Sequence, residues 1–526
     1  MESVVKNFFR IALIGVASLT VARAGDFAFA EATIDSLQAR MAAGTLTSHE
    51  LTAAYLARIA AIDKGGPAIN AVIELNPDAL AIADALDAER KAGHVRGPLH
   101  GIPILIKDNI ATADRMETTA GSLALVGAKP PHDAALVTRL RAAGAVILGK
   151  TNLSEWANFR STNSVSGWSG RGGQTHNPYA LDRNPSGSSS GSAVAVAANL
   201  CVVAVGTETD GSIVSPASVN GVVGVKPTVG LVSRTGIIPI AASQDTAGPI
   251  ARNVRDAALL LEAISGPDEH DAVTQTRPAT MAANFAAALQ PGALKGARLG
   301  LLRGPFGFRP KMEPVLAGLV DALRAAGAEV VDLGDVPALR EAGDPEGEVL
   351  RYEFKNGVNA YLATLGPAAP VKSLADLIAF NDAHRDREMP LFAQETFVKS
   401  QAKGPLTDQA YLDARAACLR IARKDGIDAL MDKNNLDALV ALTTGPAALT
   451  DPVNGGYGTG SSSSPAAVAG YPSVTVPAAQ VMGLPVGFSF FGRAWSEARL
   501  LALAADFEAH TRARREPQFL PTVKVP

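Results

Sequence analysis

The chain has 526 residues, with 48 Lys and Arg against 51 Asp and Glu, so its formal net charge is −3. Apolar residues make up 47% of it and charged residues 19%, which excludes a disordered chain, since such chains have fewer apolar residues and a larger net charge. The balanced charge also speaks against a basic surface that binds nucleic acid. Two cysteines, Cys201 and Cys418, are too few for a disulfide framework, and no Cys/His cluster has zinc-ligand spacing, so no metal is expected.

Residues 1–30 have the pattern of a secretory signal peptide. Lys6 and Arg10 precede an apolar stretch at 11–21, which is shorter than the roughly 20 residues of a transmembrane helix. Two small-residue cleavage sites follow, at 22–24 and 28–30, and Glu31 favours the second because it opens a polar mature terminus. We therefore expect a mature domain of residues 31–526 that is exported to the periplasm or secreted, without stable membrane association. An uncleaved membrane anchor is the alternative.

Helix and strand patterns alternate along the first third of the mature chain. Apolar spacing and a Thr-x-x-Glu capping box predict helices that begin near Ile34 and Thr47, and a third helix is expected over 78–92. The apolar run 102–106 predicts a buried strand that ends at Lys107. A helix over 138–143 and a strand over 145–148 follow.

Residues 163–191 are dense in Ser, Gly, Asn and Pro and show little periodicity. After them the pattern predicts a helix of small residues over 193–199, a strand over 202–205 and a turn over 206–212. Further expected elements are a helix over 252–264, a strand over 298–302, a helix over 314–326, strands over 329–333 and 436–442, and a mostly helical region over 340–430. This alternation, without a repeat or a linker, indicates a single α/β domain.

Three segments carry residues suited to chemistry. The run 101–108 ends in Lys107-Asp108, the run 187–192 contains four serines, and the run 206–216 contains Asp210-Gly211-Ser212. The Gly-x-Ser-x-Gly match around Ser189 would suit a nucleophile elbow, but an elbow serine follows a strand and Arg183-Asn184-Pro185-Ser186 precedes this one.

Together these segments resemble the amidase signature family, whose motifs are G-x-P-x-x-x-K-D, a Gly/Ser-rich run and a turn ending in D-G-S-I or G-G-S-I. The segment 149–156 and the tail at 470–487 are also family-like, and the resemblance spans roughly residues 34–512. Within the family the chain is most similar to bacterial peptide amidases. The resemblance implies a single large α/β domain with a central mixed β-sheet covered by helices on both faces.

The same resemblance implies a Ser–Ser–Lys triad, with Ser212 as nucleophile, Ser188 as bridging serine on a cis peptide bond, and Lys107 as base. A serine needs an adjacent base, and burial lowers the pKa of a lysine so that it can act as one. The backbone N–H groups of Thr209, Asp210, Gly211 and Ser212 are expected to form the oxyanion hole. The Asp210 side chain itself is expected only to shape the turn. Val214 stands where many members carry Arg, and Ser190 and Asp210 stand where many carry Gly.

The resemblance implies an amide hydrolase that works through an acyl-enzyme and needs no cofactor, with C-terminal peptide amides as the expected substrates. The helical region 305–440 is expected to line the pocket. An aryl acylamidase acting on anilides is the alternative within the class. Two alternatives lie outside the class: a secreted binding protein with an inactive site, or an amidotransferase-type subunit. The oligomeric state is left open.

Overall fold

The computed structural model describes residues 27–279, 281, 284–303 and 308–524. Among these, eleven strands form one mixed sheet in the order β1-β3-β2-β6-β8-β7-β12-β13-β11-β9-β10. The strands are β1 (Val72–Leu75), β2 (Pro103–Lys107), β3 (Val146–Thr151), β6 (Val203–Glu208), β7 (Val223–Lys226), β8 (Thr246–Ala251), β9 (Arg298–Leu302), β10 (Glu329–Gly334), β11 (Ala438–Leu442), β12 (Ser473–Val481) and β13 (Leu484–Phe491). A separate two-stranded ribbon joins β4 (Trp168–Ser169) to β5 (Gly173–Gln174).

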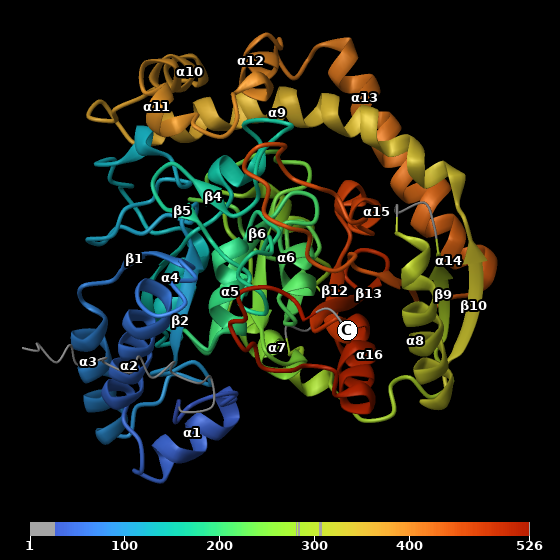
Figure 1. Ribbon diagram of the computed structural model, residues 1–526, viewed down its shortest axis with the longest axis horizontal. Helices are drawn as coiled ribbons and strands as arrows, with labels where there is room; N and C mark the ends of the chain where they lie inside the picture. The colour runs from blue at the N-terminus through green and yellow to red at the C-terminus, as the bar shows by residue number, and fades with distance from the viewer. Residues whose placement is uncertain (1–26, 280, 282–283, 304–307, 525–526) are drawn as a thin grey trace, which may run out of the picture.

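Helices surround the sheet and also form an arch along one side of the molecule, from α9 to α14 (Figure 1). They are α1 (Ile34–Ala42), α2 (Ser48–Arg58), α3 (Ala79–Lys91), α4 (Ala135–Ala142), α5 (Ser190–Ala197), α6 (Val214–Val219), α7 (Val254–Ile264), α8 (Glu313–Ala325), α9 (Gly343–Thr364), α10 (Leu374–Ala383), α11 (Arg385–Glu388), α12 (Glu395–Gln401), α13 (Gln409–Leu419), α14 (Asp428–Asn434), α15 (Ser464–Ala469) and α16 (Glu497–Thr511). None of these helices is both long and apolar enough to cross a membrane.

Strand β13 shows how the two faces of the sheet are covered. Successive residues of a strand point to opposite faces. Phe488 and Phe490 pack their rings on Phe507 of α16. Gly487, which points to the other face, lies so close to α6 that an added Cβ would sit 2.8 Å from the hydroxyl of Ser218. Helices therefore lie on both faces, and the predicted fold class is confirmed.

Most predicted elements are present, and the capping box at Thr47 and Glu50 caps α2. Five strands of the sheet, β1, β7, β8, β12 and β13, were not predicted. Strand β8 contains Gly248-Pro249 and β12 contains Pro477, residues that ordinarily interrupt strands. Tertiary pairing overrides that local preference, since both strands have neighbours on each side.

The predicted signal peptide lies outside the described residues up to residue 26. From Phe27 onward the chain packs on the domain: Phe27 and Phe29 lie against Tyr55 of α2, with ring centroids 5.1 and 6.5 Å away. The guanidinium groups of Arg58 and Arg40 cover these two rings. Only 8% of Phe29 is exposed. The segment that contains the second cleavage candidate is thus part of the packed fold.

Candidate active site

Lys107 stands at the carboxyl end of β2, a strand whose five residues are all buried. Strand β2 runs parallel to β6, so Lys107 lies beside the end of β6, where Thr207 is found. The Lys107 ammonium group is 2.7 Å from the Ser188 hydroxyl, 2.9 Å from the Thr207 hydroxyl and 3.3 Å from the Thr207 carbonyl oxygen. The predicted pairing of Lys107 with Ser188 is therefore present.

Burial determines the protonation of Lys107. The side chain is fully buried, and loss of hydration lowers its pKa from the ordinary 10.5 to about 7. The carboxylates of Glu208 and Asp245 oppose this shift. A lysine with such a pKa is partly neutral near pH 7, as a general base must be.

Ser188 follows Gly187 across a cis peptide bond, as the resemblance implied. Packing explains the glycine, because a Cβ at residue 187 would sit 2.2 Å from the hydroxyl of Ser154. The Ser188 carbonyl accepts a hydrogen bond from the Ser154 backbone N–H at 3.1 Å, which ties this loop to the end of β3. Ser188 is fully buried.

Ser212 lies on the loop between β6 and α6 and is 9% exposed. Its carbonyl accepts from the N–H of Ser189 at 3.1 Å, so the two serine-bearing loops are joined by their backbones. Within the described chain the Ser212 hydroxyl makes no hydrogen bond. The loops that carry Ser188 and Ser212 are therefore joined through their backbones, and the two hydroxyl groups are not hydrogen-bonded to one another. Ser212 is brought to the same place as Lys107 and Ser188.

Glu208 holds the far end of this loop. Its carboxylate accepts from the N–H groups of Ile213 and Val214 at 2.6 and 3.0 Å, at the start of α6. For the described residues, the N–H groups of Asp210, Gly211 and Ser212 donate to no other part of the protein. Gly211 has φ +78° and a Cβ there would sit 2.8 Å from the Ser463 hydroxyl, so only glycine fits. The loop therefore presents free donors next to Ser212.

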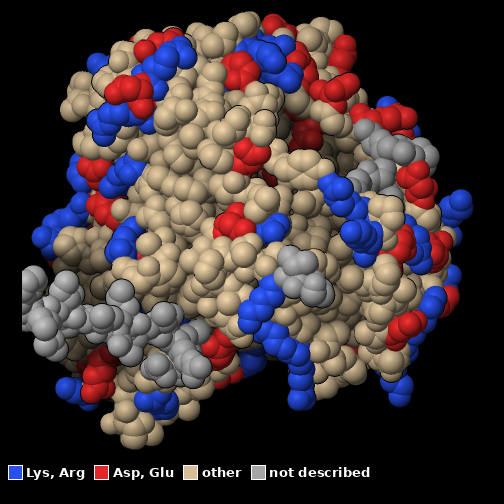
Figure 2. Space-filling view, viewed as in Figure 1, with Lys and Arg blue, Asp and Glu red and all other residues tan. Residues whose placement is uncertain are grey.

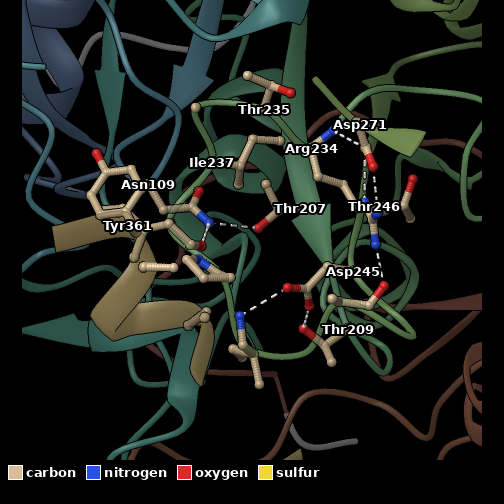
Figure 3. Close-up of a pocket in the computed structure, with 18 of the residues that line it drawn as sticks. Asn109, Thr207, Thr209, Arg234, Thr235, Ile237, Asp245, Thr246, Asp271 and Tyr361 are labelled. Carbon is tan, nitrogen blue, oxygen red and sulfur yellow. Dashed lines mark hydrogen bonds and ion pairs between the residues drawn. The ribbon is translucent and has the colours of Figure 1, made fainter. Parts of the chain in front are cut away.

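Two hollows border the Ser212 loop. The first, of about 390 Å³, has Thr207 and Thr209 in its wall together with Asn109 and Tyr361 (Figure 3). The Asn109 amide donates to the Thr207 hydroxyl at 3.0 Å, and Thr209 donates to Asp245 at 2.5 Å. Burial raises the pKa of Asp245 to about 6.

The second hollow, of about 420 Å³, has Ser186 and Ser215 in its wall. Its wall includes Asn158, and the preceding residue, Ala157, lines the first hollow; both residues have positive φ. Residues of α9, which lies within the region 305–440, line the first hollow.

Sequence reasoning missed Thr207, Asn109 and Glu208 as site residues. Each lies near the end of a strand and close to a predicted residue. Asn109 comes two residues after Lys107, and Thr207 and Glu208 are the last two residues of β6, directly before the predicted residues 209–212. Polar residues at the carboxyl ends of neighbouring strands were the signal that could have found them.

The chain matches the family model Amidase over residues 50–501. A probable amidase of Arabidopsis thaliana is 42% identical over 503 residues, which cover 94% of this chain and 93% of that protein. A glutamyl-tRNA(Gln) amidotransferase subunit of Chloroflexus aurantiacus is 36% identical, over 91% of this chain and 96% of that protein.

Solved structures give a similar result. The native peptide amidase from Stenotrophomonas maltophilia is 56% identical to this chain and superposes with a TM-score of 0.90, over 94% of this chain and 99% of that one. The peptide amidase PAM in complex with the competitive inhibitor chymostatin is also 56% identical, with a TM-score of 0.90, over 93% and 99% of the two chains.

Proposed function

The chain belongs to the amidase family and is an amide-hydrolysing enzyme, and we propose that it removes ammonia from C-terminal peptide amides with a Ser212–Ser188–Lys107 triad. Its substrates are small-molecule or peptide amides. The observation that carries the proposed mechanism is the 2.7 Å contact between Lys107 and Ser188, in a fully buried setting beside the Ser212 loop.

The proposed reaction begins with neutral Lys107. Its amine takes the proton of the Ser188 hydroxyl while Ser188 takes the proton of Ser212, whose oxygen forms a bond to the amide carbon. The protonated relay then gives its proton to the leaving nitrogen as the C–N bond breaks, which releases ammonia and leaves an acyl-enzyme on Ser212. Water, deprotonated by the same relay, attacks the ester carbon and frees the carboxylic acid and the Ser212 hydroxyl.

The negative charge that develops on the carbonyl oxygen needs nearby donors. We assign this role to the backbone N–H groups of residues 209–212, and the free N–H groups of Asp210, Gly211 and Ser212 support the assignment. Donors fixed before the reaction stabilise the transition state without a reorganisation cost. The anchoring of Ile213 and Val214 by Glu208 keeps this loop in place.

The shape of the surface supports a peptide, rather than a small anilide, as the substrate. The hollow beside Ser215 shares Ala447, Ala448, Tyr457 and Thr459 with a groove of about 600 Å³. Together they offer an extended channel longer than one substituted ring requires. Met312, Leu449 and Val481 are among the apolar residues that line the groove.

The groove also carries positive charge. Arg183, Arg309 and Lys311 line it against a single carboxylate, Asp451. Basic side chains are visible over the region between α15 and α8 in Figure 2. We expect peptide amides with an acidic residue upstream of the amide to be preferred over matched peptides with a basic residue there. The kcat/KM should be about two- to fivefold higher, since an exposed ion pair contributes only a small free energy.

A substrate panel tests both the function and this preference. Ammonia release is measured from peptide amides, amino acid amides and glutamine, and aniline release from anilides. Turnover of anilides alone would favour the aryl acylamidase, and turnover of glutamine alone would favour an amidotransferase-type subunit. The double variant R309Q/K311Q is the matched control: it should lose the acidic preference and keep turnover of neutral peptides, and an unchanged preference would contradict the role of these two cations.

We propose further that the protein is exported by means of its N-terminal signal peptide. The packing of Phe27 and Phe29 on Tyr55 favours cleavage after Ala24 over cleavage after Ala30, because the later cut would remove both rings from the domain. N-terminal sequencing of protein recovered from the periplasm or the medium should begin at Gly25. A terminus at Glu31 would contradict this assignment, and recovery from the cytoplasm alone would contradict export.

A further inference from the structure

Two carboxyl groups meet behind the Ser212 loop. Asp210 lies two residues before Ser212, and Glu346 lies in the first turns of α9, far away in sequence. Glu346 is 8% exposed, and its carboxyl group lies close to that of Asp210, because the Gln244 amide that donates to Glu346 also donates to the carbonyl of Thr209, the residue before Asp210. Figure 2 shows the molecular surface hollowed below α9 and α13, with acidic side chains at the bottom of the hollow.

The other contacts of the pair leave one oxygen unmatched. The Ser464 hydroxyl donates to Asp210 Oδ2 at 2.6 Å, and the Gln244 amide donates to Glu346 Oε1 at 2.8 Å. Asp210 Oδ1 is buried, and in the described chain it accepts no hydrogen bond from a backbone N–H, an amide or a hydroxyl group. A buried carboxylate oxygen without a donor is costly, and a proton on the neighbouring carboxyl group would supply the missing donor.

The electrostatic surroundings favour a proton on the Glu346 carboxyl group. Burial is the main cause that raises the pKa of Glu346 well above its ordinary value, and the adjacent Asp210 carboxylate raises it further. Two charged groups interact electrostatically with Asp210 from the sheet side: Glu208 at the end of β6 and Lys226 at the end of β7. The Cys418 thiol faces Glu346 from α13, and its pKa is raised to about 11, so it stays neutral near pH 7. Ser464 and Gln244 are neutral.

We propose that Asp210 and Glu346 share one proton and act as positioning residues, which clamp the Ser212 loop to α9. The clamp has two parts. One is the shared hydrogen bond to Asp210, and the other is Gln244, whose amide donates both to Glu346 and to the Thr209 carbonyl at 3.3 Å. Both hold the segment whose N–H groups are proposed to stabilise the oxyanion, so the catalytic consequence of the clamp rests on the proposed function.

The clamp has a consequence for pH dependence. When the shared proton is lost at alkaline pH, two carboxylates repel one another in a buried site and the loop loses its anchor. The wild-type kcat/KM should therefore fall on the alkaline side through this pair. This fall is separate from the acid-side loss expected when Lys107 becomes protonated.

The variant E346Q tests the proposal. A glutamine of the same size can donate its N–H to Asp210 and accept from Gln244 with its oxygen, so it keeps the network and removes the titration. We expect near-wild-type kcat/KM at neutral pH and an alkaline fall that is abolished or moved upward by about one pH unit or more. The matched control is E353Q on the same helix, where Glu353 is buried and bonded to Tyr411 and Ser243. It should leave the alkaline fall in place.

Two further measurements need no substrate and so separate this proposal from the proposed function. The infrared difference spectrum between the wild type and E346Q should show the stretch of one protonated carboxyl group at neutral pH, since other buried carboxyl groups with a raised pKa, such as Glu155, are common to both proteins. The folded state holds one proton more than the unfolded state above the ordinary glutamate pKa, so wild-type Tm should fall with rising pH more steeply than that of E346Q. If E346Q does not fold, D210N offers the same test from the other side. An alkaline fall shared by the wild type and E346Q, or no protonated carboxyl signal, would overturn the proposal.

Discussion

Replacing Ser212 with alanine is expected to lower kcat/KM by about 10⁴-fold or more, because it removes the hydroxyl on which the proposed acyl-enzyme forms. The fold should survive, since the Ser212 contact that joins the two loops is made by its carbonyl oxygen. Ammonia release from a peptide amide measures the loss, and Tm shows that the variant is folded.

Ser218→Ala is the matched control for Ser212→Ala. Ser218 is a fully buried serine of α6 whose hydroxyl contacts the Thr444 hydroxyl at 2.8 Å and accepts from the Gly487 N–H. Its removal should cost about 1 kcal/mol of stability and leave turnover largely intact. If S212A kept a kcat/KM within about tenfold of the wild type, Ser212 would not be the nucleophile.

Lys107 should set the acid side of the pH profile. Its pKa of about 7 means that the proton is bound below that pH and lost above it. Only the neutral amine can accept a proton from Ser188, so kcat/KM should rise about tenfold per pH unit below 7 and level off above it. K107M should lower kcat/KM by about 10⁴-fold or more at any pH. The loss of Tm should be small, because methionine fills the volume and the two Thr207 oxygens that Lys107 contacts keep Ser189 and Asn109 as donors.

Lys150 offers a control for the burial of a lysine. It is also fully buried, and burial lowers its pKa to about 8, but its ammonium group donates to the Ile110 carbonyl and the Thr118 hydroxyl. K150M should lower Tm, because it leaves these acceptors without a donor, and should keep the acid side of the profile where it is. A kcat/KM that does not change with pH on either side of 7 would exclude Lys107 as the base.

Short segments carried enough information to identify the family and most of the helices. Helices α1 and α2 follow from apolar spacing and a local cap, α3 follows from a run rich in Ala and charged residues, and strand β2 follows from its continuous apolar run. Strands β8 and β12 could not be predicted this way, because Gly248, Pro249 and Pro477 give a local signal against a strand that only pairing with distant neighbours outweighs.

The residues predicted to carry out catalysis could be identified from the sequence alone: a lysine at the end of an apolar strand and two serines in glycine-rich runs. How they act together depends on the folded chain. The contact between Lys107 and Ser188 depends on the parallel pairing of β2 with β6 and on the hydrogen bonds that join Ser189, the next residue, to Thr207 at the end of β6. The lowered pKa of Lys107 requires complete burial, which many segments create jointly. The meeting of Asp210 with Glu346 is likewise invisible in the sequence, because these residues lie far apart along the chain and no local pattern encodes a contact over that separation.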